Sequence, residues 1–146
     1  MMLPEFQADG NLPPGKHSAG WGEVASRFGT TAHRKKLLLG LERALAALRD
    51  AGCRRVYLDG SFVTSKRRPN DYDVAWDPAG VNIRQLLANE PTLGEFGYER
   101  AKQKLRFHGE FFPSNATADL VGNTFLEYFQ IDKKSQKPKG IVVLDL

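Results

Sequence analysis

The sequence contains a single cysteine, Cys53, among its 146 residues. One cysteine cannot form a disulfide within the chain, and so sparse a use of cysteine is typical of proteins kept in a reducing compartment. Cys53 directly precedes a predicted strand, where we interpret it as a packing residue and not as a nucleophile. The cysteine content therefore excludes an internal disulfide framework and predicts a cytoplasmic protein.

Long apolar runs are also missing. No stretch approaches the roughly 20 apolar residues that a transmembrane helix needs. The first residues include Pro4, Glu5 and Asp9 but no apolar run, so we expect no signal peptide at this end. The chain shows no internal repeat and no long low-complexity segment. These absences favour a globular protein that acts away from a membrane.

Neither sign of charge dominates the chain. The 21 Lys and Arg residues exceed the 17 Asp and Glu residues to give a net charge of +4, which permits an anionic partner such as a nucleotide or RNA without requiring one. The length is that of one domain with a sizeable core. We therefore predict a single domain over residues 1–146. Its Pro- and Gly-rich residues 1–20 form either an ordered arm laid over the domain or a flexible tail.

The clearest secondary-structure signal is a long helix, for which Gly29-Thr30-Thr31 offers an N-cap and which ends at Gly52, with a shorter helix predicted over 21–28. Leucines at spacings of three and four give the long helix one apolar stripe, which we expect to back a sheet. The stripe consists of Leu37, Leu38, Leu41, Leu45 and Leu48, and the predicted charged side consists of Arg34, Lys35, Glu42, Arg43, Arg49 and Asp50. Cations in the segment 33–36 are unfavourable for the helix dipole, which indicates either an anionic partner or a solvated face.

Two short predicted strands, 55–58 and 74–76, flank a turn that carries candidate functional residues. Asp71 and Asp73 lead directly into the second strand and share its alternation. Because side chains alternate along a strand, these carboxylates point the same way, with Cα atoms about 6.5–7 Å apart. Two carboxylates on one face repel each other unless a cation lies between them. The pattern therefore favours a divalent metal such as Mg²⁺, or Mn²⁺ in its place.

The turn between the strands is suited to phosphate. Gly60 lets a phosphate approach bare backbone, and Ser61 adds a hydroxyl donor. The run Lys66-Arg67-Arg68 follows, and it either helps to hold a triphosphate or RNA or forms a solvated turn. Gly-Ser is also a common turn sequence, and Asn70-Asp71 is ordinary turn chemistry. A phosphate cradle beside a metal-binding carboxylate pair is what nucleotide chemistry needs.

Gly60-Ser61, a gap of nine residues and then Asp71-Tyr72-Asp73 on a strand resemble the signature of the polymerase-β-type nucleotidyltransferase superfamily. The flanking residues are similar to a small bacterial stand-alone group of that superfamily, described mainly as a domain of unknown function and similar to toxin–antitoxin nucleotidyltransferases. The resemblance covers most of the chain. The segments that carry it are 12–15, 58–64, 69–74 and 139–142.

The resemblance implies an α/β fold, for which α+β is an alternative label, with a small mixed sheet and helices packed on it. It also implies transfer of a nucleoside monophosphate from an NTP to a hydroxyl, with release of pyrophosphate. Asp71 and Asp73 would hold Mg²⁺ or Mn²⁺. The residues expected to bind the nucleotide are Gly60, Ser61, Lys66 and Arg67.

Enzymes of this superfamily usually carry a third carboxylate on a strand next to the Asp-x-Asp strand. The run 105–112, stopped by Pro113, predicts such a strand, and Glu110 lies in it. Glu110 would ligate a metal and help to deprotonate the attacking hydroxyl. Two alternatives stay open, namely that Asp119 takes this role or that there is no third ligand.

The resemblance leaves the acceptor as a protein or an RNA, with tRNA among the candidates. It implies a setting in a bacterial toxin–antitoxin or phage-defence system, with a cognate toxin or antitoxin as partner. The basic loop 133–140 either contacts nucleic acid or only solubilises the chain, and 141–144 reads as a buried closing strand. The main alternative is a catalytically silent module that binds a nucleotide, RNA or protein. A metal-dependent nuclease is a third hypothesis, which the Gly60-Ser61 element disfavours.

Overall fold

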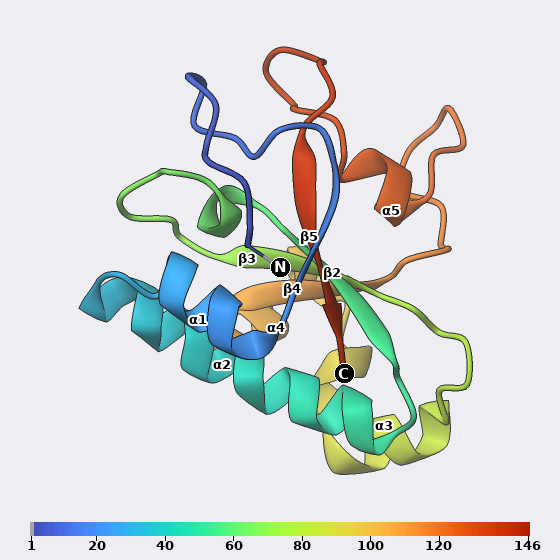
Figure 1. The fold of residues 1–146 in the computed structure, drawn as a ribbon. Coiled ribbons are helices and arrows are strands. Elements are labelled where there is room, and N and C mark those ends of the chain that lie inside the picture. Colours follow the sequence, from blue (N-terminus) through green and yellow to red (C-terminus); the bar gives the residue numbers. More distant parts are fainter. Residues whose placement is uncertain (1) are drawn as a thin grey trace.

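A five-stranded mixed sheet forms the centre of the computed structural model, which describes residues 2–146 (Figure 1). The strands lie in the order β1-β5-β2-β3-β4. β2 runs antiparallel to both β3 and β5, whereas β1 is parallel to β5 and β3 is parallel to β4. This confirms the predicted α/β fold. The bounds are β1 Gly15–Ala19, β2 Arg55–Asp59, β3 Tyr72–Trp76, β4 Gly109–Pro113 and β5 Gly140–Asp145.

Helices cover both faces of this sheet, with α1 and α2 on one side and α5 on the other (Figure 1). Thr31 caps α2 by accepting a hydrogen bond from Arg34 N at 3.1 Å, and the predicted leucine stripe is buried. None of the helices in residues 2–146 is both long and apolar enough to cross a membrane. The bounds are α1 Trp21–Phe28, α2 Ala32–Asp50, η1 Ser61–Val63, α3 Ile83–Asn89, η2 Pro91–Gly94, α4 Gly97–Phe107 and α5 Phe125–Tyr128.

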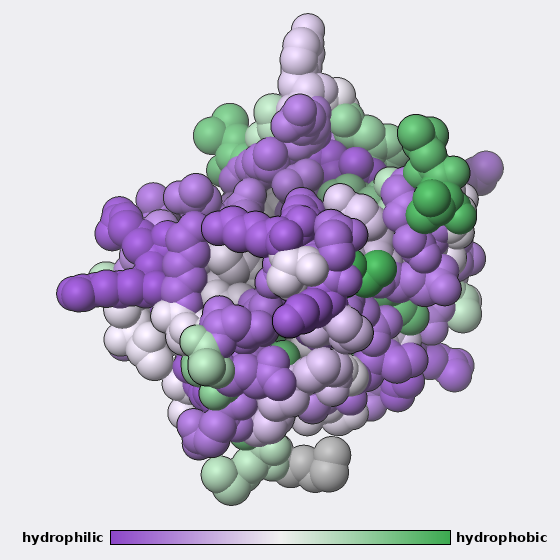
Figure 2. Space-filling model, turned by 90° about the horizontal axis from the view of Figure 1, so that it is seen from above, coloured by the Kyte–Doolittle hydropathy of each residue, from purple (hydrophilic) through white to green (hydrophobic). Residues whose placement is uncertain are grey.

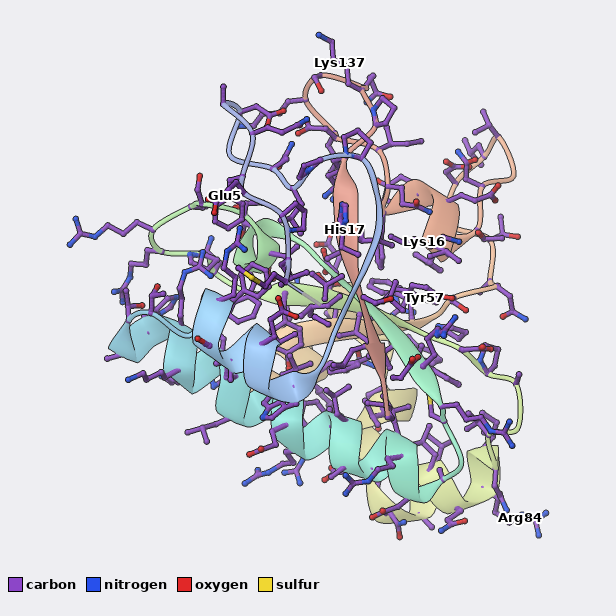
Figure 3. The ribbon with its side chains drawn as sticks, in the orientation of Figure 1. Glu5, Lys16, His17, Tyr57, Arg84 and Lys137 are labelled. Carbon is purple, nitrogen blue, oxygen red and sulfur yellow. The ribbon has the colours of Figure 1, made fainter. Side chains whose placement is uncertain are left out.

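Alternation along the strands divides the apolar side chains between two cores. Leu58 and Val74 belong to the larger core beneath α1 and α2, whereas their strand neighbours Tyr57 and Ala75 belong to a smaller core that includes Phe129, the residue after α5. Figure 3 shows Tyr57 on β2. Polar residues that continue the alternation of Tyr57 and Ala75 therefore project from the face covered by α5.

The predicted strand over 105–112 is wrong at its start. Residues 105–107 are the last turn of α4, His108 has a left-handed φ of 66° that ends the helix, and β4 begins only at Gly109. A Cβ at Gly109 would lie 2.2 Å from the ring of Tyr72. β4 can therefore approach β3 this closely at its first residue only because that residue is glycine.

The N-terminal arm is ordered over its described residues, 2–20. Its last part forms β1 at the edge of the sheet. Arg27 donates to the carbonyls of Leu3 and Pro4 at 3.2 and 2.6 Å, and Leu3 and Leu12 are buried. These contacts place the described part of the arm against the domain.

Candidate functional site

A cleft of about 530 Å³ opens where the end of β2, the start of β3 and the loop before β5 meet. Figure 2 shows that the face seen from above, on which the loops gather, is largely hydrophilic. Most of the side chains that line the cleft are polar or charged. The lining consists of residues 9–11, 59–61, 64–66 and 131–134 together with Asp71, Asp73, Tyr128, Phe129 and Lys139.

Tyr72 orients the two aspartates that flank it. Its ring is fully buried in the larger core, and its hydroxyl donates to the carbonyl of Phe107 at 2.6 Å. Because Tyr72 points into that core, Asp71 and Asp73 project from the opposite side of the chain. Both aspartates line the cleft, as their spacing predicts.

Three acidic residues on neighbouring strands lie in register beside one another. Asp59 on β2 pairs with Asp73 on β3, and Asp73 pairs with Glu110 on β4. We call Asp59, Asp73 and Glu110 the acidic row. Side chains of paired residues lie on the same face with Cβ atoms about 4.5–5.5 Å apart in an antiparallel pair, and like charges placed this way destabilise the sheet. The row therefore needs positive charge from elsewhere.

Lysines neutralise the two ends of the acidic row. Lys139 Nζ lies 2.9 Å from Asp59 Oδ1, and Lys104 Nζ lies 3.6 Å from Glu110 Oε1. Within residues 2–146, Asp73 at the centre has no ion pair with a basic side chain. Among the described residues, the carboxyl group at the centre of the row thus lacks the close lysine that each end of the row has.

The crowding of carboxyl groups in the acidic row changes the pKa of Asp73. Burial, reinforced by the charges of Asp59, Glu110 and Asp71, raises the pKa of Asp73 to about 7, and the ammonium of Lys133 opposes the rise. Burial also raises the pKa of Asp59, although Lys139 opposes it, and that of Glu110, although Lys104 opposes it. A cation bound at Asp73 would favour its ionised form and relieve the repulsion.

Carboxylate oxygens are the donors that Mg²⁺ and Mn²⁺ prefer. Across the described chain, no group of three or more His, Cys, Asp or Glu side chains is arranged to hold a metal ion. Asp71 and Asp73 line one cleft as a pair, so a metal there would take further oxygens from a ligand. Mg²⁺ is often held in this way, by one or two carboxylates together with substrate phosphates. The donor set fits a cation that arrives with a phosphate ligand.

The turn after β2 brings Gly60 against the acidic row. Gly60 has a φ of +93°, a conformation that favours glycine, and a Cβ there would lie 3.3 Å from both the backbone nitrogen and Oδ2 of Asp73. Ser61 follows as the first residue of η1 and lines the cleft. A glycine is therefore favoured at position 60 for two structural reasons, its positive φ and the short distance to Asp73. These reasons are separate from any contact with phosphate.

Arg34 holds the segment that follows this turn. Its guanidinium donates to the carbonyls of Phe62 and Thr64 at 2.7 and 2.9 Å, and also to the carbonyl of Lys66. Arg34 is only 4% exposed, so its predicted place on the charged outer side of the helix is wrong. The carbonyls of this tight segment need donors, and a planar guanidinium can serve several of them at once.

The structure brings most of the predicted site residues to one cleft, but not all of them. Lys66 lines the cleft, whereas Arg67 lines two other hollows and not the cleft. Glu110 is in register with Asp73 but is not among the lining residues. Asp119 stabilises its own loop. Its carboxylate accepts hydrogen bonds from the backbone and side-chain nitrogens of Asn123 at 3.0 and 2.8 Å. Of the two candidates for a third carboxylate, Glu110 is the one beside the aspartates.

The sequence alone did not reveal the roles of Asp59 and Lys139. A signal for Asp59 was present, because it immediately precedes Gly60 and alternates with Tyr57 on the strand. No local signal indicates that Lys139, one of several lysines in its loop, reaches Asp59. That contact depends on the antiparallel pairing of β2 with β5.

Comparison with protein families finds a match over residues 4–145 to the family described as "Family of unknown function (DUF6932)". Neither the search of curated proteins nor the search of solved structures gives a match. The geometry of the cleft is therefore the basis for assigning a function.

Proposed function

This chain belongs to the DUF6932 family, and we propose that it is a Mg²⁺-dependent nucleotidyltransferase. It would move a nucleoside monophosphate from an NTP to a hydroxyl on a protein or RNA acceptor. The observation that carries the proposal is the position of Asp73. It lies between two acidic residues that have their own lysines, has a pKa raised to about 7 by burial and its acidic neighbours, and shares a cleft with Gly60 and Ser61.

Asp71 and Asp73 would hold the metal in this reaction. When bound there with the NTP, Mg²⁺ supplies charge neutralisation at the phosphates and lowers the pKa of an acceptor hydroxyl. The ion could be replaced by Mn²⁺, which takes the same oxygen ligands. The paired lysines at the ends of the acidic row leave this position as the place where added positive charge has the largest effect.

The other residues of the site would bind and orient the phosphates. Ser61 offers a hydroxyl and a backbone N–H at the start of η1, and Lys66 offers an ammonium from the same side of the cleft. Arg67 would assist from outside the cleft lining. Lys133 and Lys134 also line the cleft. Positive charge from these separate segments suits the anionic tail of an NTP.

In the transfer step, the acceptor oxygen forms a bond to the α-phosphorus while the bond from that phosphorus to the bridging oxygen of the β-phosphate breaks. Pyrophosphate leaves with the electron pair of that bond. The carboxylate of Glu110, which is in register beside Asp73, would accept the proton of the acceptor hydroxyl. Lys104, at 3.6 Å from Glu110 Oε1, would hold that carboxylate in place.

We place the reaction in the cytoplasm, where Mg²⁺ and NTPs are both present. The resemblance of the Gly-Ser and Asp-x-Asp elements to toxin–antitoxin nucleotidyltransferases supports a cognate toxin or antitoxin, or an RNA such as tRNA, as the macromolecular partner.

A catalytically silent binding module is the second candidate. Two observations favour it: Glu110 lies outside the cleft lining, and the described residues gather no complete set of three metal-binding side chains. Such a module would bind Mg²⁺–NTP without transferring any part of it.

Incubation with α-labelled NTPs, Mg²⁺ and cell lysate separates the two candidates. We expect wild-type protein to label an acceptor, and digestion with RNase or protease then identifies its class. Asp71→Asn with Asp73→Asn should abolish labelling and the enhancement of NTP binding by Mg²⁺. Asp50→Asn, at the exposed far end of α2, is the matched control and should change neither. Mg²⁺-enhanced binding of NTP by wild type without labelling would favour the binding module, and metal-dependent binding that survives the double substitution would refute the site.

A further inference from the structure

The large apolar side chains that line the cleft come from one segment of the chain, which we call the apolar wall. Among the described lining residues they are Tyr128, Phe129 and Ile131, which come from the end of α5 and the turn after it. The acidic lining residues Asp71 and Asp73 and the Gly60 turn come from another part of the chain, the start of β3 and the end of β2. A nucleotide is divided in the same way, into a flat base with apolar faces and a charged phosphate tail.

We propose that Tyr128 is the platform on which the nucleobase of the substrate stacks, so that the wall formed by α5 is a base-binding subsite. This inference rests on the proposed nucleotidyltransferase function and adds to it the part of the cleft that recognises the base. An aromatic side chain can stack on any of the nucleobases, because every base has a π-face.

The wall is held rigidly before any ligand arrives. A capping box fixes α5, since Thr124 Oγ1 accepts from Glu127 N at 3.2 Å and Glu127 Oε1 accepts from Thr124 N at 2.9 Å. Phe129, whose ring centroid lies 6.2 Å from that of Tyr128, is buried against Phe112 with a centroid distance of 5.5 Å. A preorganised ring binds its ligand without the cost of ordering it.

One lysine links the Tyr128 ring to the acidic row. Lys133 Nζ lies 5.8 Å from the centroid of the Tyr128 ring, so a cation lies over one face of this ring. The same ammonium opposes the burial and the neighbouring carboxylates that raise the pKa of Asp73. Because one side chain acts on both groups, a single nucleotide can span them. On binding, the base would take the place of the Lys133 ammonium over the ring, and that ammonium would turn to the phosphates.

The segment after Tyr128 is tied to the rest of the cleft. Asn11 Nδ2 on the N-terminal arm donates to Asp132 Oδ2 at 2.8 Å, and Lys139 N donates to Gln130 O at 2.8 Å. The arm is joined in turn to the phosphate side, because Ser65 N donates to Gly10 O at 2.9 Å. These bonds join the segment after Tyr128, through the arm, to the loop that carries Lys66.

The test compares the affinity for Mg²⁺–ATP with that for Mg²⁺ and inorganic triphosphate, both measured by calorimetry. Tyr128→Ala should weaken ATP binding about 5- to 100-fold and leave triphosphate binding unchanged, because it removes only the stacking surface. Tyr128→Phe keeps the ring and should bind ATP like wild type. Tyr98→Ala is the matched control, since Tyr98 is 96% exposed and lies outside the cleft lining.

Equal ATP affinity in wild type and in folded Tyr128→Ala would overturn the subsite. An equal loss of ATP and triphosphate affinity would overturn it as well, because the substitution would then have disturbed the whole cleft. Acceptor labelling that depends on Asp71 and Asp73, together with ATP affinity that does not depend on Tyr128, would overturn the subsite alone and leave the proposed function standing. Wild-type protein that binds neither ligand would overturn both.

Discussion

Lys139 Nζ lies 2.9 Å from Asp59 Oδ1, and the two side chains are only 15% and 5% exposed. The pair joins the residue before β5 to the last residue of β2 and places a positive charge at one end of the acidic row. A buried ion pair is weak evidence for stability by itself, because desolvation offsets much of the attraction. Loss of one partner is costly, however, since it leaves the other charge buried without compensation.

We therefore expect Lys139→Met to lower the free energy of unfolding by about 3 kcal/mol at neutral pH, as measured by urea denaturation. Adding Asp59→Asn should restore part of the loss because it removes the stranded carboxylate. Lys137→Met is the control, since Lys137 lies at the outer end of the same loop (Figure 3) and is exposed. Equal stability of the Lys139→Met and Lys137→Met variants would contradict the importance of the pair.

The raised pKa of Asp73 predicts how the stability of the metal-free protein depends on pH. Burial and the neighbouring carboxylates raise this pKa to about 7, whereas an unfolded chain has an Asp pKa of about 3.9. The folded state then binds the proton more tightly. The contribution of Asp73 to the free energy of unfolding is therefore fully present below about pH 4 and falls as pH rises toward 7, by at most about 1.4 kcal/mol per pH unit.

Asp73→Asn removes this titration, so the variant should gain stability relative to wild type as pH rises and gain most above pH 7. Denaturation in the presence of a chelator at about pH 5, 6, 7 and 8 measures the difference. A difference between the two proteins that stays constant over this range would show that Asp73 does not titrate there.

Arg34 is expected to be essential for the segment between Ser61 and Lys66. Arg34→Met would leave buried carbonyls without donors, at about 1–3 kcal/mol each, so we expect a loss of at least about 3 kcal/mol in the free energy of unfolding. Arg34→Lys should recover little, because an ammonium lacks the planar fork. Arg43→Met, on the exposed side of α2, is the control and should change stability by less than about 0.5 kcal/mol. The prediction fails if Arg34→Met and Arg43→Met are equally stable.

Glu110 and Asp119 can be separated by their effects on nucleotide transfer. Glu110→Gln keeps the shape of the side chain but removes its capacity to accept a proton, and we expect it to lower the transfer rate about 100-fold or more while NTP affinity changes little. Asp119→Asn should leave the rate unchanged and loosen only its own loop, in which its carboxylate bonds to Asn123. Single-turnover transfer and equilibrium NTP binding on the same samples are the measurements. A larger rate loss in Asp119→Asn would reverse the assignment.

The sequence by itself determined the elements that depend on short-range chemistry. The capping segment Gly29-Thr30-Thr31 and the leucine periodicity predicted α2, and the alternation of a strand predicted that Asp71 and Asp73 share a direction. Local patterns were insufficient at 105–107, where aromatic and aliphatic residues fit a strand but continue α4. A short apolar run is compatible with either state, and contacts from outside the run decide between them.

Only the tertiary structure decided which charges meet. The register of β2, β3 and β4 places Asp59, Asp73 and Glu110 in one row, and the pairing of β5 with β2 brings Lys139 to Asp59. The burial of Arg34 was hidden for the same reason, because the carbonyls that it serves belong to a distant segment. Register and burial arise from pairings between residues far apart in the chain, and a sequence pattern reports only on neighbours within a few residues.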